Sequence, residues 1–159
     1  MSSVLTVVFC CPTGSDEVSR RTAITFRVGN DLDLDELIEL YSATSRGVRR
    51  PLDDLAMMAD MLRHANLIVT AWEGPLLAGV SRSLTDFSDV AYLSDLTVRE
   101  SHQRRGIGRE LIHHTRAALG PRCKLVLLSA PAAVDYYPKL GFTRHPSAWT
   151  LDTQEPLLK

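Results

Sequence analysis

Two glycines one residue apart, Gly106 and Gly108, stand in the stretch SHQRRGIGRE of this 159-residue chain. A main chain that approaches a phosphate closely needs residues without a Cβ atom, and amide N–H groups at a helix start supply hydrogen bonds and partial positive charge. Arg104 and Arg105 precede the glycines, where cations oppose the helix dipole and so indicate a bound anion, unless they are only solvated. The stretch predicts a phosphate-binding loop, with an ordinary helix-entry turn as the alternative.

Two common nucleotide motifs do not fit this stretch. The motif G-x-x-x-x-G-K-[ST] fails because Gly108 is followed by Arg109 and Glu110. The dinucleotide motif G-x-G-x-x-G fails because Leu111 stands where the third glycine belongs. We therefore expect a pyrophosphate loop of another kind.

A strand and a helix flank the loop in the order that phosphate binding requires. Residues Val90–Val98 alternate and are rich in β-formers, which predicts a strand. From Arg104 onward apolar residues recur at helical spacing until Gly120 and Pro121 end the pattern. The apolar residues of this helix are Ile107, Leu111, Ile112, Thr115, Ala118 and Leu119.

Upstream of that strand we expect one strand, two tandem helices and a hairpin. The strand covers Thr22–Val28, and Asp31 or Asp33 caps the first helix, while Asp53 caps the second. Two apolar runs around Glu73, Gly74 and Pro75 have the composition of an antiparallel hairpin. The stripe residues are Leu34, Leu37, Ile38 and Tyr41 in the first helix and Leu55, Met58 and Leu62 in the second.

Downstream of the loop helix we expect CKLVLLS to be a buried strand, AAVDYYPKL a short helix, and FTRH and AWTLD late strands. Pro138 indicates that this last helix is kinked or very short. The whole order predicts a mixed α/β domain with parallel pairing only across the helix that follows Val98.

Composition restricts the function classes. With 18 basic and 19 acidic residues the net charge is near zero, so we expect neither nucleic acid nor membrane as a partner. Cys10, Cys11 and Cys123 lack disulfide or metal spacing and indicate reduced thiols in a cytoplasmic protein. Residues 1–21 are expected to be an N-terminal extension, an extra strand or a leader, before one domain over residues 22–159.

The segment LTVRESHQRRGIGRELI resembles the acetyl-CoA signature of the GNAT superfamily of N-acetyltransferases, Q/R-x-x-G-x-G/A after the fourth strand. YPKLGF resembles that family's Y-x-K-x-G-F ending of the last helix. The resemblance covers almost all of the chain beyond its first ~20 residues. It implies a GNAT-like N-acyltransferase fold with a central, mostly antiparallel sheet, splayed fourth and fifth strands and about four flanking helices.

The resemblance also implies the residues that hold acetyl-CoA as co-substrate. Main-chain groups of Leu96, Thr97 and Val98 would pair with the pantetheine arm, and the amides from Arg104 to Arg109 would hold the pyrophosphate. The signature itself is matched by Gln103, Arg104, Arg105, Gly106, Ile107 and Gly108. Ala130 stands where the family commonly has an asparagine that contacts pantetheine, so one side-chain contact is missing.

Two side chains are the catalytic candidates. Tyr137 occupies the place of the tyrosine that donates to the coenzyme A sulfur in many family members, and the N–H of Val98 is the candidate for polarising the thioester oxygen. Tyr92 and Ser94 stand where many members place a Glu or His base, and neither is a base. Asp95 is the candidate base or amine-orienting residue, although alternation points it away from Ser94 unless a bulge intervenes; a water chain is the alternative.

The function expected from the resemblance is transfer of an acetyl group to a primary amine of a small molecule or protein by direct attack in a ternary complex. The alternative is a non-catalytic acyl-CoA-binding regulatory module. We expect no metal, because the adjacent His113 and His114 point to different sides of their helix. A homodimer is left open, and mixed charge between Tyr41 and Asp54 fits an amine-bearing acid or a solvated loop.

Overall fold

The structure is a computed structural model that describes residues 23–44 and 50–158. These residues fall into two compact units, one ending at Leu128 and one beginning at Ser129. The expected extension over residues 1–21, and the arginines at positions 46 and 49, lie outside the described residues. No helix in the described ranges is long and apolar enough to cross a bilayer.

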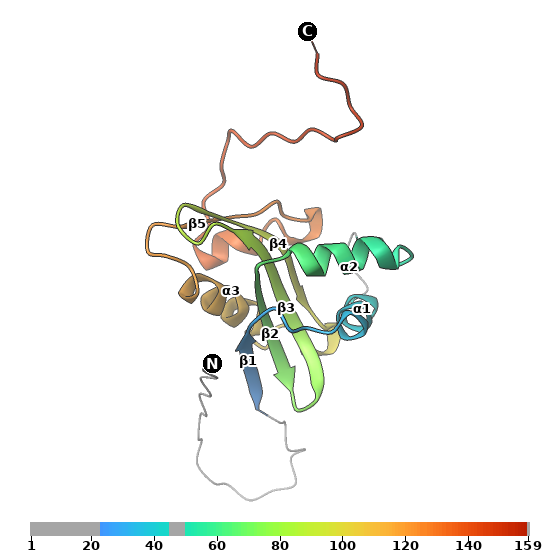
Figure 1. Ribbon diagram of the computed structural model, residues 1–159. Coiled ribbons are helices and arrows are strands. Elements are labelled where there is room, and N and C mark those ends of the chain that lie inside the picture. Colours follow the sequence, from blue (N-terminus) through green and yellow to red (C-terminus); the bar gives the residue numbers. More distant parts are fainter. Residues whose placement is uncertain (1–22, 45–49, 159) are drawn as a thin grey trace, which may run out of the picture. The chain divides into compact units, whose positions relative to one another are not determined.

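The first unit is built on a five-stranded sheet in the order β1-β2-β3-β4-β5 (Figure 1). The first three neighbouring pairs are antiparallel and only β4 and β5 are parallel, as the sequence predicted. The hairpin turn falls at Gly74, whose φ is 60°. The strands are β1 Ile24–Val28, β2 Leu67–Glu73, β3 Leu76–Thr85, β4 Val90–Val98 and β5 Lys124–Val126.

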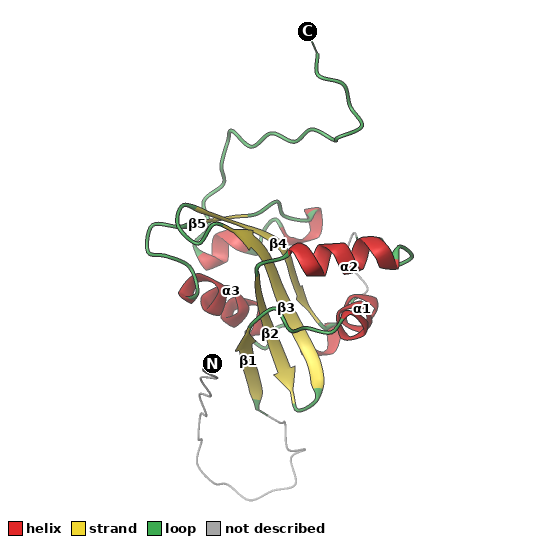
Figure 2. Cartoon of the chain, in the orientation of Figure 1, coloured by secondary structure: helices red, strands yellow, loops and turns green. Residues whose placement is uncertain are grey.

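Helices cover both faces of this sheet (Figure 2). On one face α1 (Leu34–Ser42) and α2 (Leu55–His64) pack over a core in which Leu37, Leu40 and Met58 are fully buried. On the other face α3 (Ile107–Ala117) buries Ile107 and Leu111 against β2 and β3. The strands between these layers carry near-continuous buried runs, as expected of a sheet that is covered twice.

The two tandem helices begin at aspartates. Asp33 caps α1, since its carboxylate accepts hydrogen bonds from the amides of Asp35 and Glu36. The second cap is Asp54, which accepts from the amide of Met57, so the prediction of Asp53 was wrong by one residue. Leu55 was also assigned wrongly to the buried stripe; it lies at the first turn and is 59% exposed.

The end of the chain departs from prediction. The strand expected over CKLVLLS is only Lys124–Val126, and Lys124 and Val126 are exposed. The last helix is replaced by two 3₁₀ turns, Pro131–Ala133 and Tyr137–Leu140, because Pro138, inside the expected helix, lacks an amide hydrogen and clashes with the preceding turn. The described residues therefore hold three α-helices, fewer than the four expected.

The late strands over FTRH and AWTLD are also absent from the described residues, where nothing after Val126 pairs in a sheet. Residues 143–158 are exposed throughout. Pro146 lies between the two predicted strands and cannot donate to a ladder. Short apolar runs of this kind gain little from pairing when no face of them is buried.

Candidate functional site

The second half of β4 has a strand neighbour on one side only within the described residues. Its pairing with β3 runs from Ala91 to Val98, whereas its parallel pairing with β5 stops at Tyr92. From Leu93 onward the main chain of β4 thus presents one edge without a paired strand. This is the divergence of the fourth and fifth strands that the family resemblance implied.

Main-chain groups of β4 alternate between β3 and this open edge. The amide of Arg99 donates to the Ala78 carbonyl at 2.9 Å, so Arg99 faces β3. Because successive residues of a strand direct their N–H and C=O groups to opposite sides, Val98 and Leu96 face the open edge and Thr97 faces β3. Of the three residues predicted to pair with pantetheine, Leu96 and Val98 therefore have suitable main-chain groups, and Thr97 does not.

The predicted phosphate loop leads from β4 into α3. Arg104 and Gly106 both have left-handed backbone conformations, with φ of 59° and 82°. Gly106 is the N-cap of α3 and has no side-chain cap, so the first-turn amides carry the unsatisfied donors of a helix start. Gly106 and Arg109 are exposed, and alternating left-handed residues before a helix form a concave set of amides that suits an anion.

Side chains around the loop hold it against the hairpin. The Arg105 guanidinium donates to Glu73 Oε1 at 2.7 Å, and the buried His102 ring lies 2.9 Å from Glu73 Oε2. The Arg105 bond, then the His102 bond, lower the pKa of Glu73. Gln103 Nε2 donates to the Val98 carbonyl at 3.2 Å. The main-chain amide of Gln103 is also engaged, because it donates to the Glu100 carbonyl at 3.2 Å. The predicted Arg105 and Gln103 thus position the loop through protein contacts.

The end of β4 is fixed from the other face by Arg99. Its guanidinium is buried, donates to the Leu77 carbonyl at 3.2 and 3.1 Å, and forms a bidentate pair with Glu39 of α1. The Arg99 hydrogen bond lowers the pKa of Glu39, so this carboxylate stays charged. Sequence reasoning missed Arg99. The main chain at Val98 is consequently tied both to the sheet and to α1.

A bulge in β4 brings Ser94 and Asp95 to the same guanidinium. Arg82 pairs with Asp95 across the sheet, but the next residue, Ser83, pairs with Leu93, so Ser94 is an extra residue. Arg82 Nε donates to Asp95 Oδ2 at 2.5 Å and Nη2 donates to Ser94 Oγ at 2.9 Å. Strand alternation would direct Asp95 away from Ser94 unless a bulge intervened, and this bulge places both side chains on the same side of the strand.

Asp95 is almost entirely occupied by protein donors. Besides Arg82, the Tyr41 hydroxyl donates to Oδ2 at 2.9 Å and the Arg50 guanidinium pairs with Oδ1. Burial and the Asp95 charge raise the pKa of Tyr41 far above its ordinary value, which keeps it a neutral donor. Three donors take most of the roughly four lone-pair positions of a carboxylate. Sequence reasoning named Asp95 but missed these partners.

Tyr137, the other catalytic candidate, belongs to the unit that begins at Ser129. It opens the second 3₁₀ turn, and its ring meets those of Tyr136 and Phe142 edge to face at 5.5 Å. Burial, and then the neighbouring Tyr136, raise the pKa of Tyr137. The phenol therefore stays protonated at neutral pH, as a proton donor must.

No group of three or more His, Cys, Asp or Glu side chains within residues 23–44 and 50–158 is arranged to hold a metal ion. His114 instead stacks on Phe26, with ring centroids 4.9 Å apart, and His113 contacts His114 edge to face. The two histidines of α3 thus have aromatic packing partners.

Comparisons with known proteins agree with this geometry. The model of the acetyltransferase (GNAT) domain matches residues 41–150. A GNAT family acetyltransferase of Streptococcus pneumoniae is similar in structure, with 22% identity, a TM-score of 0.65 and coverage of 84% of this chain and 100% of that one. A Trypanosoma brucei acetyltransferase has 25% identity, a TM-score of 0.58 and coverage of 82% and 99%.

The aminoglycoside N-acetyltransferase AAC(6')-Iy, in complex with CoA, is similar at 18% identity and a TM-score of 0.63, with coverage of 86% of this chain and 99% of that one. No curated protein matches this chain in sequence. The family model spans well over half of the chain. The chain belongs to the GNAT acetyltransferase family.

Proposed function

We propose that the protein is an N-acetyltransferase that moves the acetyl group of acetyl-CoA to a primary amine by direct attack in a ternary complex. The observation that carries this proposal is the open edge of β4 at Leu96 and Val98, which ends beside the left-handed loop and the unsatisfied amides at the start of α3. An extended amide-bearing arm that ends in a pyrophosphate matches these two features in order.

Each part of acetyl-CoA has a proposed partner. The main-chain groups of Leu96 and the carbonyl of Val98, which also accepts from Gln103 Nε2, would pair with the amides of the pantetheine arm as an added strand would. The amides between Arg104 and Arg109 would hold the pyrophosphate, with Gly106 and Gly108 giving room for its approach. Ala130 offers no polar side chain to the arm, so main-chain contacts supply most of the specificity for it.

The chemistry needs a neutral amine, a donor to the thioester oxygen and an acid for the departing thiolate. The Val98 N–H is the proposed donor to the oxygen, where negative charge develops. Tyr137 is the proposed acid, which its raised pKa supports. Asp95 is proposed to orient the amine through its hydrogen-bonded network rather than to take its proton, because its oxygens already accept from Tyr41 and Arg82. A water chain then serves as the base.

The same observation supports a second candidate, a non-catalytic acyl-CoA-binding module. In the described part of β4, no Glu or His side chain is present, and the single carboxylate is engaged by protein donors. A binding module would need the open edge and the loop but no free base.

Release of free thiol from acetyl-CoA with a panel of amines tests the proposal, and calorimetry measures cofactor binding separately. We expect acetyl-CoA to bind and thiol release to depend on the amine. Binding with no release for any amine would favour the module, and absence of binding would contradict both candidates. The small-molecule amines belong at the head of the panel, because an aminoglycoside N-acetyltransferase is among the similar structures.

A further inference from the structure

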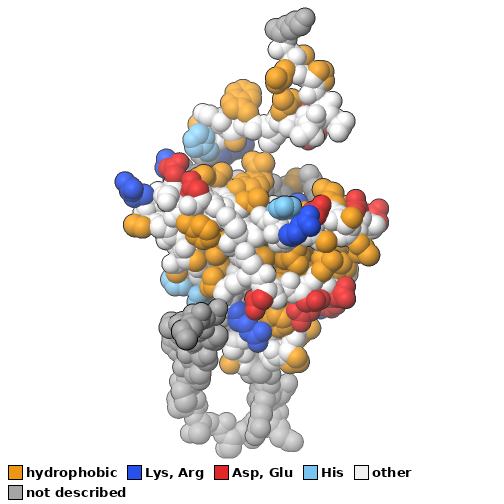
Figure 3. Space-filling model, viewed as in Figure 1, with side chains coloured by type: hydrophobic (Ala, Val, Ile, Leu, Met, Phe, Trp, Pro, Cys, Tyr) orange, Lys and Arg blue, Asp and Glu red, His pale blue; other side chains and the backbone are white. Residues whose placement is uncertain are grey.

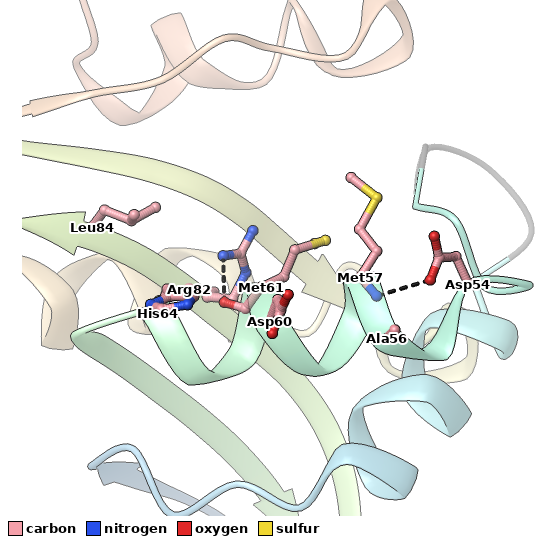
Figure 4. Close-up of a pocket in the computed structure, with 8 residues that line it drawn as sticks. All are labelled: Asp54, Ala56, Met57, Asp60, Met61, His64, Arg82 and Leu84. Atoms are coloured by element: carbon pink, nitrogen blue, oxygen red, sulfur yellow. Dashed lines mark hydrogen bonds between the residues drawn. The ribbon is translucent and has the colours of Figure 1, made fainter.

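An open groove of about 620 Å³ runs along α2 on the face of the sheet that α1 and α2 cover. At 100° per residue, Met57, Met61 and His64 fall within a stripe roughly 60° wide on α2, turned about 90° from the buried Met58. In the close-up the two methionine side chains project from the same side of the helix (Figure 4). Ala56 and Leu84 complete an apolar lining, and the space-filling view shows hydrophobic side chains gathered where α2 lies (Figure 3).

Two carboxylates flank the methionine stripe. Asp54 and Asp60 both line the groove and both are exposed. They are six residues apart, which corresponds to about 9 Å along a helix axis. Asp54 accepts one hydrogen bond from the amide of Met57, and Asp60 pairs at 2.5 Å with Arg63, with both of those side chains more than half exposed. A surface pair of this kind is readily exchanged for a ligand cation.

The one guanidinium that lines the described part of the groove is committed elsewhere. Arg82 donates to Asp95 at 2.5 Å, to the Met61 carbonyl at 3.0 Å and to Ser94 Oγ at 2.9 Å. Its charge is thus paired inside the protein, and its donors point at protein acceptors. The lining that faces a ligand combines methionine thioethers, the His64 ring and two carboxylates, and it offers no uncommitted Lys or Arg among the described residues.

We infer that this groove binds the acceptor and that the acceptor is an aliphatic di- or polyamine, an inference that rests on the proposed acetyl transfer. The amine that reacts is neutral, so the carboxylates recognise a second amine, which is protonated. The flexible methionines fit an aliphatic chain between the two nitrogens. An acceptor with a carboxylate in place of the second amine would meet Asp54 or Asp60 and be repelled.

Three acceptors of equal chain length test the inference: 1,8-diaminooctane, n-octylamine and 8-aminooctanoic acid. All three have eight carbons and differ at the last one, which carries an ammonium in the diamine, is a methyl in octylamine and is a carboxylate in the amino acid. We expect kcat/KM to be highest for the diamine and lowest for the amino acid. Equal values for all three, or a preference for the amino acid, would overturn the inference while leaving acetyl transfer intact.

Charge-removing variants locate the effect. Asp54→Asn keeps a side chain that caps a helix well. Asp54→Asn and Asp60→Asn should each lower kcat/KM for the diamine by about fivefold, and each should leave kcat/KM for octylamine unchanged. Asp53→Asn is the matched control, since Asp53 is exposed, adjacent in sequence and not part of the lining. An equal loss in the control, or equal losses for octylamine, would contradict the assignment.

Calorimetric titration of the full chain with the diamine alone separates the two proposals. Binding that weakens in Asp54→Asn and Asp60→Asn but not in Asp53→Asn supports the groove even if no amine is acetylated, in which case only the proposed acetyl transfer fails. Diamine binding that is the same in all four proteins would overturn the groove assignment. Circular dichroism spectra should coincide for the variants, because none of the three side chains is buried.

Discussion

Asp95 of β4 binds residues from three other segments, namely Tyr41, Arg50 and Arg82, so its charge should dominate the stability of the first unit. Its side chain is 4% exposed, and it pairs with Arg82, which is 5% exposed, and with Arg50, which is 27% exposed. Asp95→Asn keeps the size of the side chain and an oxygen acceptor for Tyr41. It removes the one negative charge that these two guanidiniums share.

The expected cost follows from the burial of Arg82. Removing one partner of a buried ion pair leaves an uncompensated charge, which destabilises proteins by about 3–5 kcal/mol. The retained hydrogen bonds place Asp95→Asn near 3 kcal/mol, which corresponds to a fall in Tm of roughly 10 °C for a chain of this size. Asp60→Asn is the matched control, because its pair with Arg63 is exposed and contributes about 0.5 kcal/mol or less.

Urea titration followed by circular dichroism measures both variants against the parent protein. The midpoint should fall strongly for Asp95→Asn and little for Asp60→Asn, with similar slopes. Adding Arg82→Met to Asp95→Asn should cost less than the sum of the two single changes, since the orphaned charge is removed. Equal midpoints for Asp95→Asn and Asp60→Asn would refute the role of Asp95 as the charge on which this network depends.

Three further predictions concern the cofactor loop and the acid. Gly108→Trp should abolish the rise in Tm that acetyl-CoA produces, because the ring occupies the space of the pyrophosphate; a retained shift would contradict the loop assignment. Glu73→Gln should raise the KM for acetyl-CoA several-fold with kcat unchanged, because Arg105 and His102 lose the carboxylate that holds them. The control Glu110→Gln, which removes an exposed charge in the first turn of α3, should leave the KM unchanged or lower it. The pKa of Glu73 is lower in the folded protein than its ordinary value of 4.5. Its contribution to stability is therefore complete above pH 4.5 and is lost as the pH falls through the lowered pKa. Urea midpoints of the parent and of Glu73→Gln, measured at a series of pH values, should converge as the pH falls through that range. Tyr137→Phe should lower kcat while acetyl-CoA binding is retained, and a full kcat in the variant would exclude Tyr137 as the acid. The pKa of Tyr137 is raised above the ordinary tyrosine value of 10, so the parent should keep its activity beyond pH 10.

Features that depend on neighbouring residues could be predicted from the sequence. The hairpin at Gly74, the limits of β4 and the glycine start of α3 follow from local turn and capping chemistry. The cap of α2 was missed because two adjacent aspartates have the same local preference, and only the fold decides that Asp54 reaches the amide of Met57. The last helix was expected to be kinked or very short because of Pro138, and it is divided into two 3₁₀ turns because proline cannot supply the amide hydrogen that a continuous helix needs.

The charged network around Asp95 could not be predicted from local sequence, since its members come from distant positions in the chain. Tyr41, Arg50 and Asp95 meet only after α1 and β4 are placed, and the pairing of Arg82 with Asp95 depends on the sheet register. One signal was present: an arginine lies inside the apolar run of β3 and an aspartate inside the run of β4. Buried charges are almost always paired, so two opposite charges on neighbouring strands indicate each other.

The bulge at Ser94 links the stability of the sheet to the proposed choice of acceptor. Without the extra residue, Ser94 would point away from Arg82, and one donor of this guanidinium would be free to face the groove. With the bulge, Ser94 Oγ, Asp95 and the Met61 carbonyl together engage Arg82, and the groove keeps its two carboxylates without a competing cation. Ser94→Ala should therefore release one Arg82 donor toward the groove and narrow the preference of kcat/KM for 1,8-diaminooctane over 8-aminooctanoic acid. An unchanged preference, with the folded sheet intact by circular dichroism, would separate the bulge from acceptor recognition.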